Sequence, residues 1–159
     1  MHSRIIQLSK EPLDEYEWIK ESDYYESWFV GSIADYVSDI DEGDRERQMK
    51  SWLGDFGSRG FKYDEKDMTL TVVDKGKYFM AKYSAFIDAA KKVQAATLEQ
   101  FSGYDLDHAF YQMREAYEDK FGIYIDGGNE TGLITMDEFM RYAKNGDVFY
   151  CGGIVDYHF

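Results

Sequence analysis

The spacing of apolar residues along the chain predicts several amphipathic helices. In five stretches apolar side chains recur at intervals of three or four residues, which places them on one face of a helix. The last of these stretches ends at Asn145 and Gly146, residues that commonly terminate a helix. We predict helices over residues 24–40, 44–56, 77–93, 105–120 and 136–144.

Other stretches alternate between apolar and polar positions and predict short strands. Residues 60–63 and 68–73 flank the polar turn 64–67, a pattern typical of a β-hairpin. Further strands are predicted over 3–9, 121–125 and 148–159. Helices and strands are interleaved without a repeating βαβ order, which favours an α+β fold with about five helices and a small, mainly antiparallel sheet.

The apolar stripes of the separate helices must meet to be buried, and they supply the predicted core. We assign to it one or two large side chains from each stripe. The predicted core residues are Trp28, Ile33, Trp52, Phe56, Phe79, Phe86, Phe110, Met113 and Phe139.

Composition narrows the class of protein. The 159 residues include 28 aromatic side chains, too many for a chain that cannot fold, and suit a single domain spanning residues 1–159. They carry 31 Asp and Glu against 18 Lys and Arg, a net charge of −13. A surface that binds nucleic acid or anionic lipid needs concentrated Lys and Arg, so we expect neither as a direct partner.

The negative charge is concentrated in residues 11–44, which contain twelve acids and the single base Lys20. On the predicted helix 24–40, Asp35 and Asp39 would lie about 5–6 Å apart at Cβ and start a row of negative charge. Aromatic side chains among the acids are of the kind that interfaces favour. The alternative is a solvated acidic face that only aids solubility. The candidate partner-binding residues are Glu17, Glu21, Glu26, Asp35, Asp39, Asp41 and Glu42.

Residues 127–138 resemble the calcium-binding loop of EF-hands. With Glu138 at loop position twelve, Gly132 takes the tight-turn position six, but Gly127 stands where the family has a ligating Asp. A strand is predicted before the loop, where an EF-hand has a helix. We therefore favour a glycine-rich turn followed by a helix capped by Thr135, and keep a calcium-binding module as the alternative.

Signatures of catalysis are sparse. The lone Cys151 lies in an apolar run, where cysteine is usually a buried hydrophobic residue, and the three histidines are scattered. One cysteine forms no internal disulfide, and the start of the chain has no signal-peptide pattern, so we expect a cytoplasmic protein. We expect no metal site, no cofactor and no enzymatic activity, with a small enzyme of unrecognised site as a further alternative.

In size, charge and aromatic content, the whole chain resembles small acidic accessory proteins of phages and conjugative elements. These include anti-restriction and anti-CRISPR inhibitors, some of which are DNA mimics. The resemblance rests on composition, and no site residues are carried over from it. It implies a non-enzymatic inhibitor that occupies the nucleic-acid-binding groove of a defence protein such as a nuclease.

Overall fold

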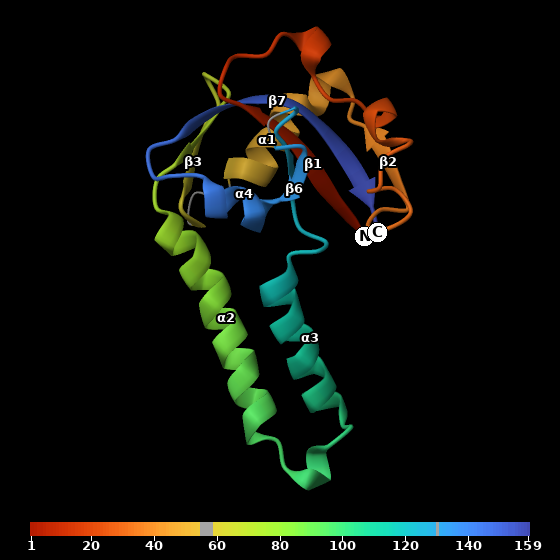
Figure 1. The fold of residues 1–159 in the computed structure, drawn as a ribbon, viewed down its shortest axis with the longest axis vertical. Helices are drawn as coiled ribbons and strands as arrows, with labels where there is room; N and C mark the ends of the chain where they lie inside the picture. Colours follow the sequence, from red (N-terminus) through yellow and green to blue (C-terminus); the bar gives the residue numbers. More distant parts are fainter. Residues whose placement is uncertain (55–58, 130) are drawn as a thin grey trace.

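The computed structural model describes residues 1–54, 59–129 and 131–159, and for Glu42 the backbone alone. It has an α+β architecture: a mixed sheet with short helices packed against it, and a long helical hairpin that projects away from the sheet (Figure 1). The first and last strands pair with each other, so the two ends of the chain lie side by side.

The sheet contains seven strands within the described residues, in the order β3-β4-β7-β1-β5-β6 with β2 also paired to β7. The pair of β1 and β5 is parallel, and the other described pairs are antiparallel. The predicted fold class is thus confirmed. The strands are β1 (His2–Ser9), β2 (Tyr36–Asp39), β3 (Phe61–Asp64), β4 (Thr69–Val72), β5 (Tyr124–Asp126), β6 (Leu133–Thr135) and β7 (Val148–His158).

Strands β1 and β7 form the centre of the sheet, with Ile5 opposite Val155 and Ile6 opposite Ile154. Their apolar runs are continuous because both faces of the sheet are covered. The register shifts between Ile6 and Leu8, which marks a β-bulge in this pair. Since β1 occupies one edge of β7, strands β4 and β2 share its other edge and pair with opposite ends of it.

Short helices cover one face of the sheet. Helix α1 (Arg45–Met49) continues into a π-helical turn, η4 (Lys50–Gly54), and α4 (Met136–Tyr142) precedes β7. Met49, Leu53 and Met140 from these helices are fully buried against Leu8 and Ile125 of the sheet. The opposite face is covered by residues 11–44, which include the 3-10 turns η1 (Glu15–Glu17), η2 (Glu21–Tyr24) and η3 (Glu42–Asp44).

The helical hairpin consists of α2 (Lys75–Ala95) and α3 (Tyr104–Glu118), joined by the turn η6 (Leu98–Gln100). Asp74 caps the start of α2 by accepting a hydrogen bond from the backbone N–H of Lys77 at 3.1 Å. Asp119 ends α3 in the left-handed conformation at φ 48°. None of the helices in the described ranges is both long and apolar enough to cross a bilayer.

The helix predicted over residues 24–40 is wrong. Only η2 and a series of turns occupy its first half, and the second half is strand β2. Gly31 adopts a φ of +89°, and the hydroxyl of Ser27 donates to the carbonyl oxygen of Tyr24, so local bonds replace a helical ladder. Trp28 and Tyr36, both on the predicted stripe, are 59% and 48% exposed.

The predicted core is confirmed only in part. Phe139 is buried, while Ile33, Trp52, Phe79, Phe86 and Met113 are half-buried and Phe56 lies outside the described residues. Phe110 is 49% exposed and Trp28 is exposed, so both predictions are wrong. Trp28 is exposed because the predicted helix over residues 24–40 does not form, and Phe110 is exposed because its hairpin packs little against the sheet. The strands of the sheet together supply more than half of the buried core residues instead.

Candidate partner-binding surface

Residues 11–44, hereafter the acidic layer, lie across the face of the sheet opposite α1 and α4. Phe29 is fully buried there, with ring centroids 4.7 Å from Tyr124 and 5.0 Å from Tyr157 in edge-to-face geometry. Tyr24 and Val37 are buried in the same cluster. The layer therefore keeps a fixed position through aromatic packing, although it contains little regular structure.

The side chain of Gln7 in β1 connects the acidic layer to the sheet through hydrogen bonds. Its Nε2 donates to the carbonyl oxygen of Glu17 at 3.0 Å, and its Oε1 accepts from the backbone N–H groups of Ile19 at 3.1 Å and Gly153 at 2.8 Å. The side chain is buried, so these three bonds satisfy groups that water does not reach. One amide thus joins β1, β7 and the layer.

Two glycines of β7 make this contact close. A Cβ on Gly152 would lie 2.3 Å from Gln7 Oε1, and a Cβ on Gly153 would lie 2.7 Å from the backbone nitrogen of Ile19. Both distances are shorter than real Cβ contacts allow. Gly153 is therefore required for the backbone of the layer to approach the strand, and Gly152 leaves room for the side chain of Gln7.

Arg45 fills the gap that β4 and β2 leave on the edge of β7. Its Nη2 donates to the carbonyl oxygen of Cys151 and its Nε to that of Gly152, both at 2.9 Å. Its guanidinium lies 3.7 Å from the ring centre of Trp18, and burial lowers the pKa of Arg45. This cation beside the layer is thus directed inward, toward backbone oxygens.

Several acids of the layer hold its turns together. Glu17 accepts a hydrogen bond from the backbone N–H of Asp14 at 2.9 Å. Glu21 and Asp39 form a reciprocal pair: Asp39 Oδ1 accepts from the N–H of Glu21 at 2.7 Å, and Glu21 Oε2 accepts from the N–H of Asp39 at 3.1 Å. Of the predicted partner-binding residues, these three therefore have a structural role.

Three other predicted partner-binding residues, Glu26, Asp35 and Asp41, have exposed side chains with few contacts. Glu26 and Asp41 are exposed, and their carboxylates form no hydrogen bond or ion pair with the part of the chain that the structure describes. Asp35 is also exposed, with Oδ2 3.3 Å from Nδ1 of His158. The side chain of Glu42 lies outside the described atoms.

The expected helical row of Asp35 and Asp39 does not form. Asp39 ends strand β2 and Asp35 directly precedes that strand, so at about 3.3 Å per residue the two are about 13 Å apart instead of 5–6 Å. The structure brings Glu21 and Asp39 together from separate segments, which spacing along the chain did not indicate. The acids of the layer thus come from several turns.

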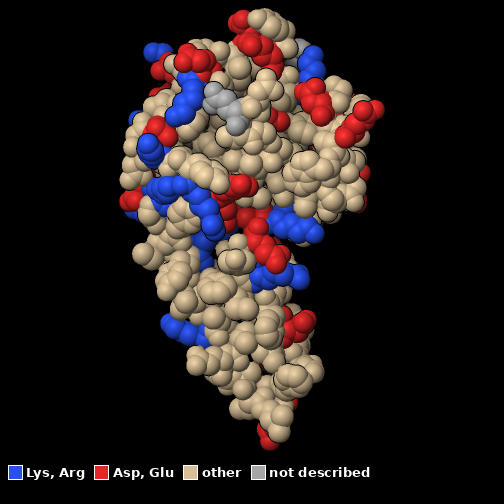
Figure 2. Space-filling view, viewed as in Figure 1, with Lys and Arg blue, Asp and Glu red and all other residues tan. Residues whose placement is uncertain are grey.

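One side of the helical hairpin shows few charged side chains. On the side shown in Figure 2, acids and bases are interspersed over the sheet body, whereas most of the hairpin surface carries no charged side chain.

Within the acidic layer Lys20 is the one base of residues 11–44. Exposed aromatic side chains lie among its acids: Tyr16 is 81%, Tyr25 60% and Trp28 59% exposed.

The segment that resembles an EF-hand loop is a β-hairpin turn. Residues 127–132 connect the antiparallel strands β5 and β6, so a strand precedes them, as predicted. Asp126 Oδ1 accepts from the N–H of Gly128 at 2.8 Å and its Oδ2 from the hydroxyl of Tyr24 at 2.6 Å. Thr135 caps α4 by accepting from the N–H of Glu138 at 3.2 Å, which confirms the predicted cap.

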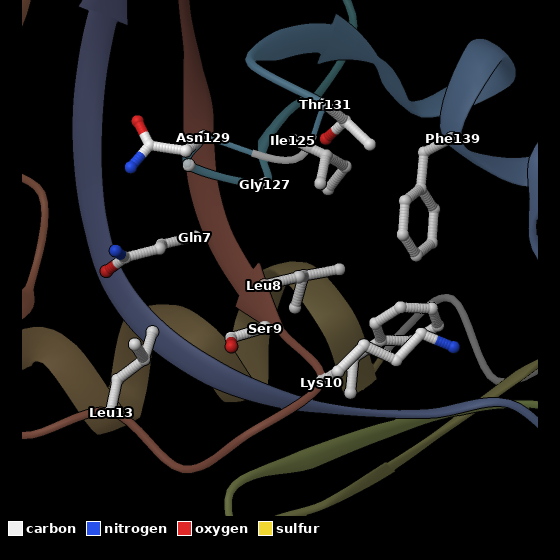
Figure 3. A pocket seen from close by; sticks show the side chains of 12 residues that line it. Gln7, Leu8, Ser9, Lys10, Leu13, Ile125, Gly127, Asn129, Thr131 and Phe139 are labelled. Carbon is white, nitrogen blue, oxygen red and sulfur yellow. The ribbon is translucent and has the colours of Figure 1, made fainter.

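This turn lines a cavity of about 230 Å³. In Figure 3, Asn129 and Thr131 of the turn stand on one side, Leu8 of β1 lies below, and Phe139 of α4 lies beside it. The described residues that line the cavity include the cation Lys10 but no carboxylate. Among the described lining residues, none therefore supplies the anionic oxygen ligands that calcium prefers.

Cys151 lies in the core between the sheet and α4, as predicted. It is buried in β7, and burial raises the pKa of its thiol to about 12. His2 and His158 lie at the paired chain ends, with ring centroids 5.0 Å apart, and His108 stacks on Tyr104 in α3. A thiol with so high a pKa is a poor nucleophile at neutral pH.

A charged cluster at the base of the hairpin was missed by sequence reasoning. Lys82 of α2 lies 3.2 Å from Asp119 at the end of α3 and 2.5 Å from Asp137 of α4. Tyr78 donates its hydroxyl proton to Asp137, and burial raises the pKa of Asp119 to about 6. The cluster borders a cavity of about 430 Å³. Its members come from three separate elements, so no local motif marks them.

In the described ranges, no three His, Cys, Asp or Glu side chains are grouped so as to hold a metal ion. Comparison of the chain with protein-family models, with curated proteins and with solved structures found no match. The function of the acidic layer, the charged cluster and the hairpin surface is therefore inferred from their geometry alone.

Proposed function

We propose that this protein is a non-enzymatic inhibitor that binds a basic partner through the acidic layer. The observation that carries the proposal is the orientation of that layer: its apolar side chains pack on the sheet while acids such as Glu26 and Asp41 are exposed. The nearby Arg45 is turned inward, so it does not neutralise this surface.

The partner that fits best is a nucleic-acid-binding protein of the cytoplasm. The groove of such a protein presents the Lys and Arg side chains that normally neutralise phosphates, and carboxylates replace phosphates electrostatically. Because the acids come from separate turns, the mimicry rests on the charge of the whole layer and not on one regular row.

The exposed aromatic side chains Tyr16, Tyr25 and Trp28 support a binding role for the same surface. Large aromatic side chains are enriched at protein interfaces, where they contribute contact area and hydrogen-bonding groups. A face that serves only solubility gains nothing from exposing them. The combination of acids with aromatic side chains favours a protein partner over simple solvation.

The test compares two variants of equal net charge. In the layer variant, Glu15, Glu26, Asp35 and Asp41 are changed to Lys, which spares the acids that hold the turns together. In the control variant, the exposed acids Glu65, Asp67, Glu99 and Glu138 are changed to Lys outside the layer. Circular dichroism confirms that both variants fold.

Each protein is immobilised and exposed to heparin-binding proteins of a lysate over about 50–500 mM salt. We expect the wild type and the control to capture a partner that added DNA displaces and that rising salt releases. The layer variant should bind it roughly tenfold or more weakly. Equal capture by the wild type and the layer variant at every salt concentration would contradict the proposal.

A further inference from the structure

The α2–α3 hairpin carries apolar side chains that the rest of the chain leaves uncovered. The two helices pack mainly against each other and extend away from the sheet (Figure 1). Among their described residues, only Tyr78, Ala89 and Ala109 are buried. The apolar stripes that the sequence predicts as core therefore lie largely at the surface.

These stripes form one continuous surface, hereafter the hairpin face. At about 100° of rotation per residue, the apolar positions of each helix fall on one side of it. The rings of Phe86 and Tyr117 lie 6.1 Å apart and join the two stripes. The hairpin face consists of Tyr83, Phe86, Ile87 and Ala90 from α2 and of Leu106, Phe110, Met113 and Tyr117 from α3.

Three of the eight side chains on this face are exposed, and the other five are half-buried. Tyr117 is 70%, Tyr83 61% and Phe110 49% exposed, and at the tip Leu98 and Phe101 are 90% and 72% exposed. Monomeric proteins rarely expose contiguous apolar patches larger than a few hundred Å². The hairpin face covers residues 83–90 of α2 and 106–117 of α3, so it is about 12–18 Å long and about 20 Å wide, or about 300 Å².

That area is less than half of the ~800 Å² that each partner contributes to a standard protein interface. The exposed tip residues Leu98 and Phe101 and neighbouring side chains of the two helices therefore have to add contact area in a stable complex. The apolar side chains of the hairpin face match the apolar centre of such interfaces.

The charges of the two helices are opposite. Helix α2 has five lysines and one aspartate, a net charge of +4, and α3 has four acids and one arginine, a net charge of −3. By its helical position, the exposed Lys91 borders the hairpin face along α2, and Asp107 and Glu118 border it along α3. The face thus has one basic and one acidic border.

We propose that the hairpin face binds the same face of a second copy of this chain, with α2 of each copy packed against α3 of the other. The two hairpins then form a four-helix bundle that buries both apolar faces. A twofold axis places each basic border beside an acidic one, so both contacts are favourable. A partner of uniform charge would attract one helix and repel the other. This inference does not depend on the acidic layer.

The first test is the mass of the protein in solution. Sedimentation at roughly 100 μM should give a dimer for the wild type. The variant with Phe110→Lys and Tyr117→Lys should sediment as a folded monomer, because both side chains are exposed in the single chain. The control Tyr16→Lys changes an exposed aromatic side chain outside the hairpin and should remain dimeric. A monomeric wild type would overturn the proposal.

The second test uses charge exchange. A basic-border variant with Lys91→Glu and an acidic-border variant with Asp107→Lys should each dimerise roughly tenfold or more weakly than the wild type, because each change occurs twice in a symmetric dimer. An equimolar mixture should recover the dimer, because the altered borders then match. A mixture that associates no better than the separate variants would overturn the pairing of α2 with α3.

Discussion

Replacing Gln7 by Ala is expected to weaken the attachment of the acidic layer to the sheet. The wild-type amide donates to Glu17 and accepts from Ile19 and Gly153, and Ala retains none of these three bonds. The backbone of the layer then loses its contacts with the Gln7 side chain, while strand β2 of the layer keeps its pairing with β7. The packing of Phe29 against the sheet remains, so the change should weaken one attachment and not unfold the whole chain.

The magnitude follows from the burial of these groups. An unsatisfied buried N–H such as that of Gly153 costs about 1–3 kcal/mol, and each lost bond to a more accessible group about 1 kcal/mol. Adding the space left by the side chain, we expect a total loss of about 2–5 kcal/mol. That is a substantial part of the ~5–15 kcal/mol that typically stabilises a domain.

Urea unfolding measures the loss. With a slope of about 1–3 kcal/mol per molar urea, the midpoint should fall by roughly 1–3 M. Amide hydrogen exchange locates the effect, because the N–H groups of Ile19 and Gly153 should lose protection while the amides of α2 keep theirs.

Gln94→Ala is the matched control, since Gln94 is exposed on α2. This change should alter the free energy of unfolding by no more than about 0.5 kcal/mol. A loss below about 1 kcal/mol for Gln7→Ala, or unchanged exchange at both reporter amides, would refute the role assigned to Gln7.

Three further predictions concern other parts of the chain. Burial raises the pKa of Asp119 to about 6, so the folded state binds the carboxyl proton of Asp119 more tightly than the unfolded state does. The stability of the wild type relative to Asp119→Asn should therefore fall by about 2–3 kcal/mol between about pH 4 and 7 in urea unfolding, and a rising difference would contradict this. Gly153→Ala should lower the free energy of unfolding by about 1–3 kcal/mol, because the new Cβ meets the backbone of the layer. Gly43→Ala is the control: the new methyl group has open space around it, so the loss should be less than about 0.5 kcal/mol. Equal losses in chemical unfolding would argue against the close approach. Calcium at about 1 mM should leave the melting temperature unchanged, because Gly127 offers no first-position carboxylate; a saturable shift that Glu138→Gln abolishes would favour the EF-hand alternative.

The elements that sequence patterns predicted correctly are those whose patterns are local. The alternation in residues 68–73 and the three-to-four spacing in residues 77–93 each reflect one element, β4 or α2, and both formed as predicted. Thr135 caps α4 because a capping hydroxyl acts only on the following turn. Such signals do not depend on what the element packs against.

The acidic layer shows where the local pattern fails. The apolar spacing of residues 24–40 also suits a chain that buries Phe29 and Val37 on a sheet, and the sheet determines the outcome. Gly31 at positive φ and β2 pairing with β7 are tertiary features that no helical periodicity contains. The acids were identified as exposed by composition, but their grouping, as in Glu21 with Asp39, required the fold.

Sequence patterns missed the charged cluster at the base of the hairpin and the exposure of the hairpin face for different reasons. Lys82, Asp119 and Asp137 meet from three elements, and none has a distinguishing neighbour in the sequence. The stripe that contains Phe110 was recognised as apolar, but the pattern does not state whether the same chain or a second copy covers it.

Hydrogen exchange of the complex with a captured basic protein decides whether the acidic layer is the contact surface. The amides of residues 11–44 should gain protection when the partner binds at low salt, and should lose the gain when high salt dissociates the complex. Amides of the hairpin, residues 75–118, should exchange as they do in the free protein. Protection confined to the hairpin, with residues 11–44 unchanged, would contradict the proposed role of the acidic layer.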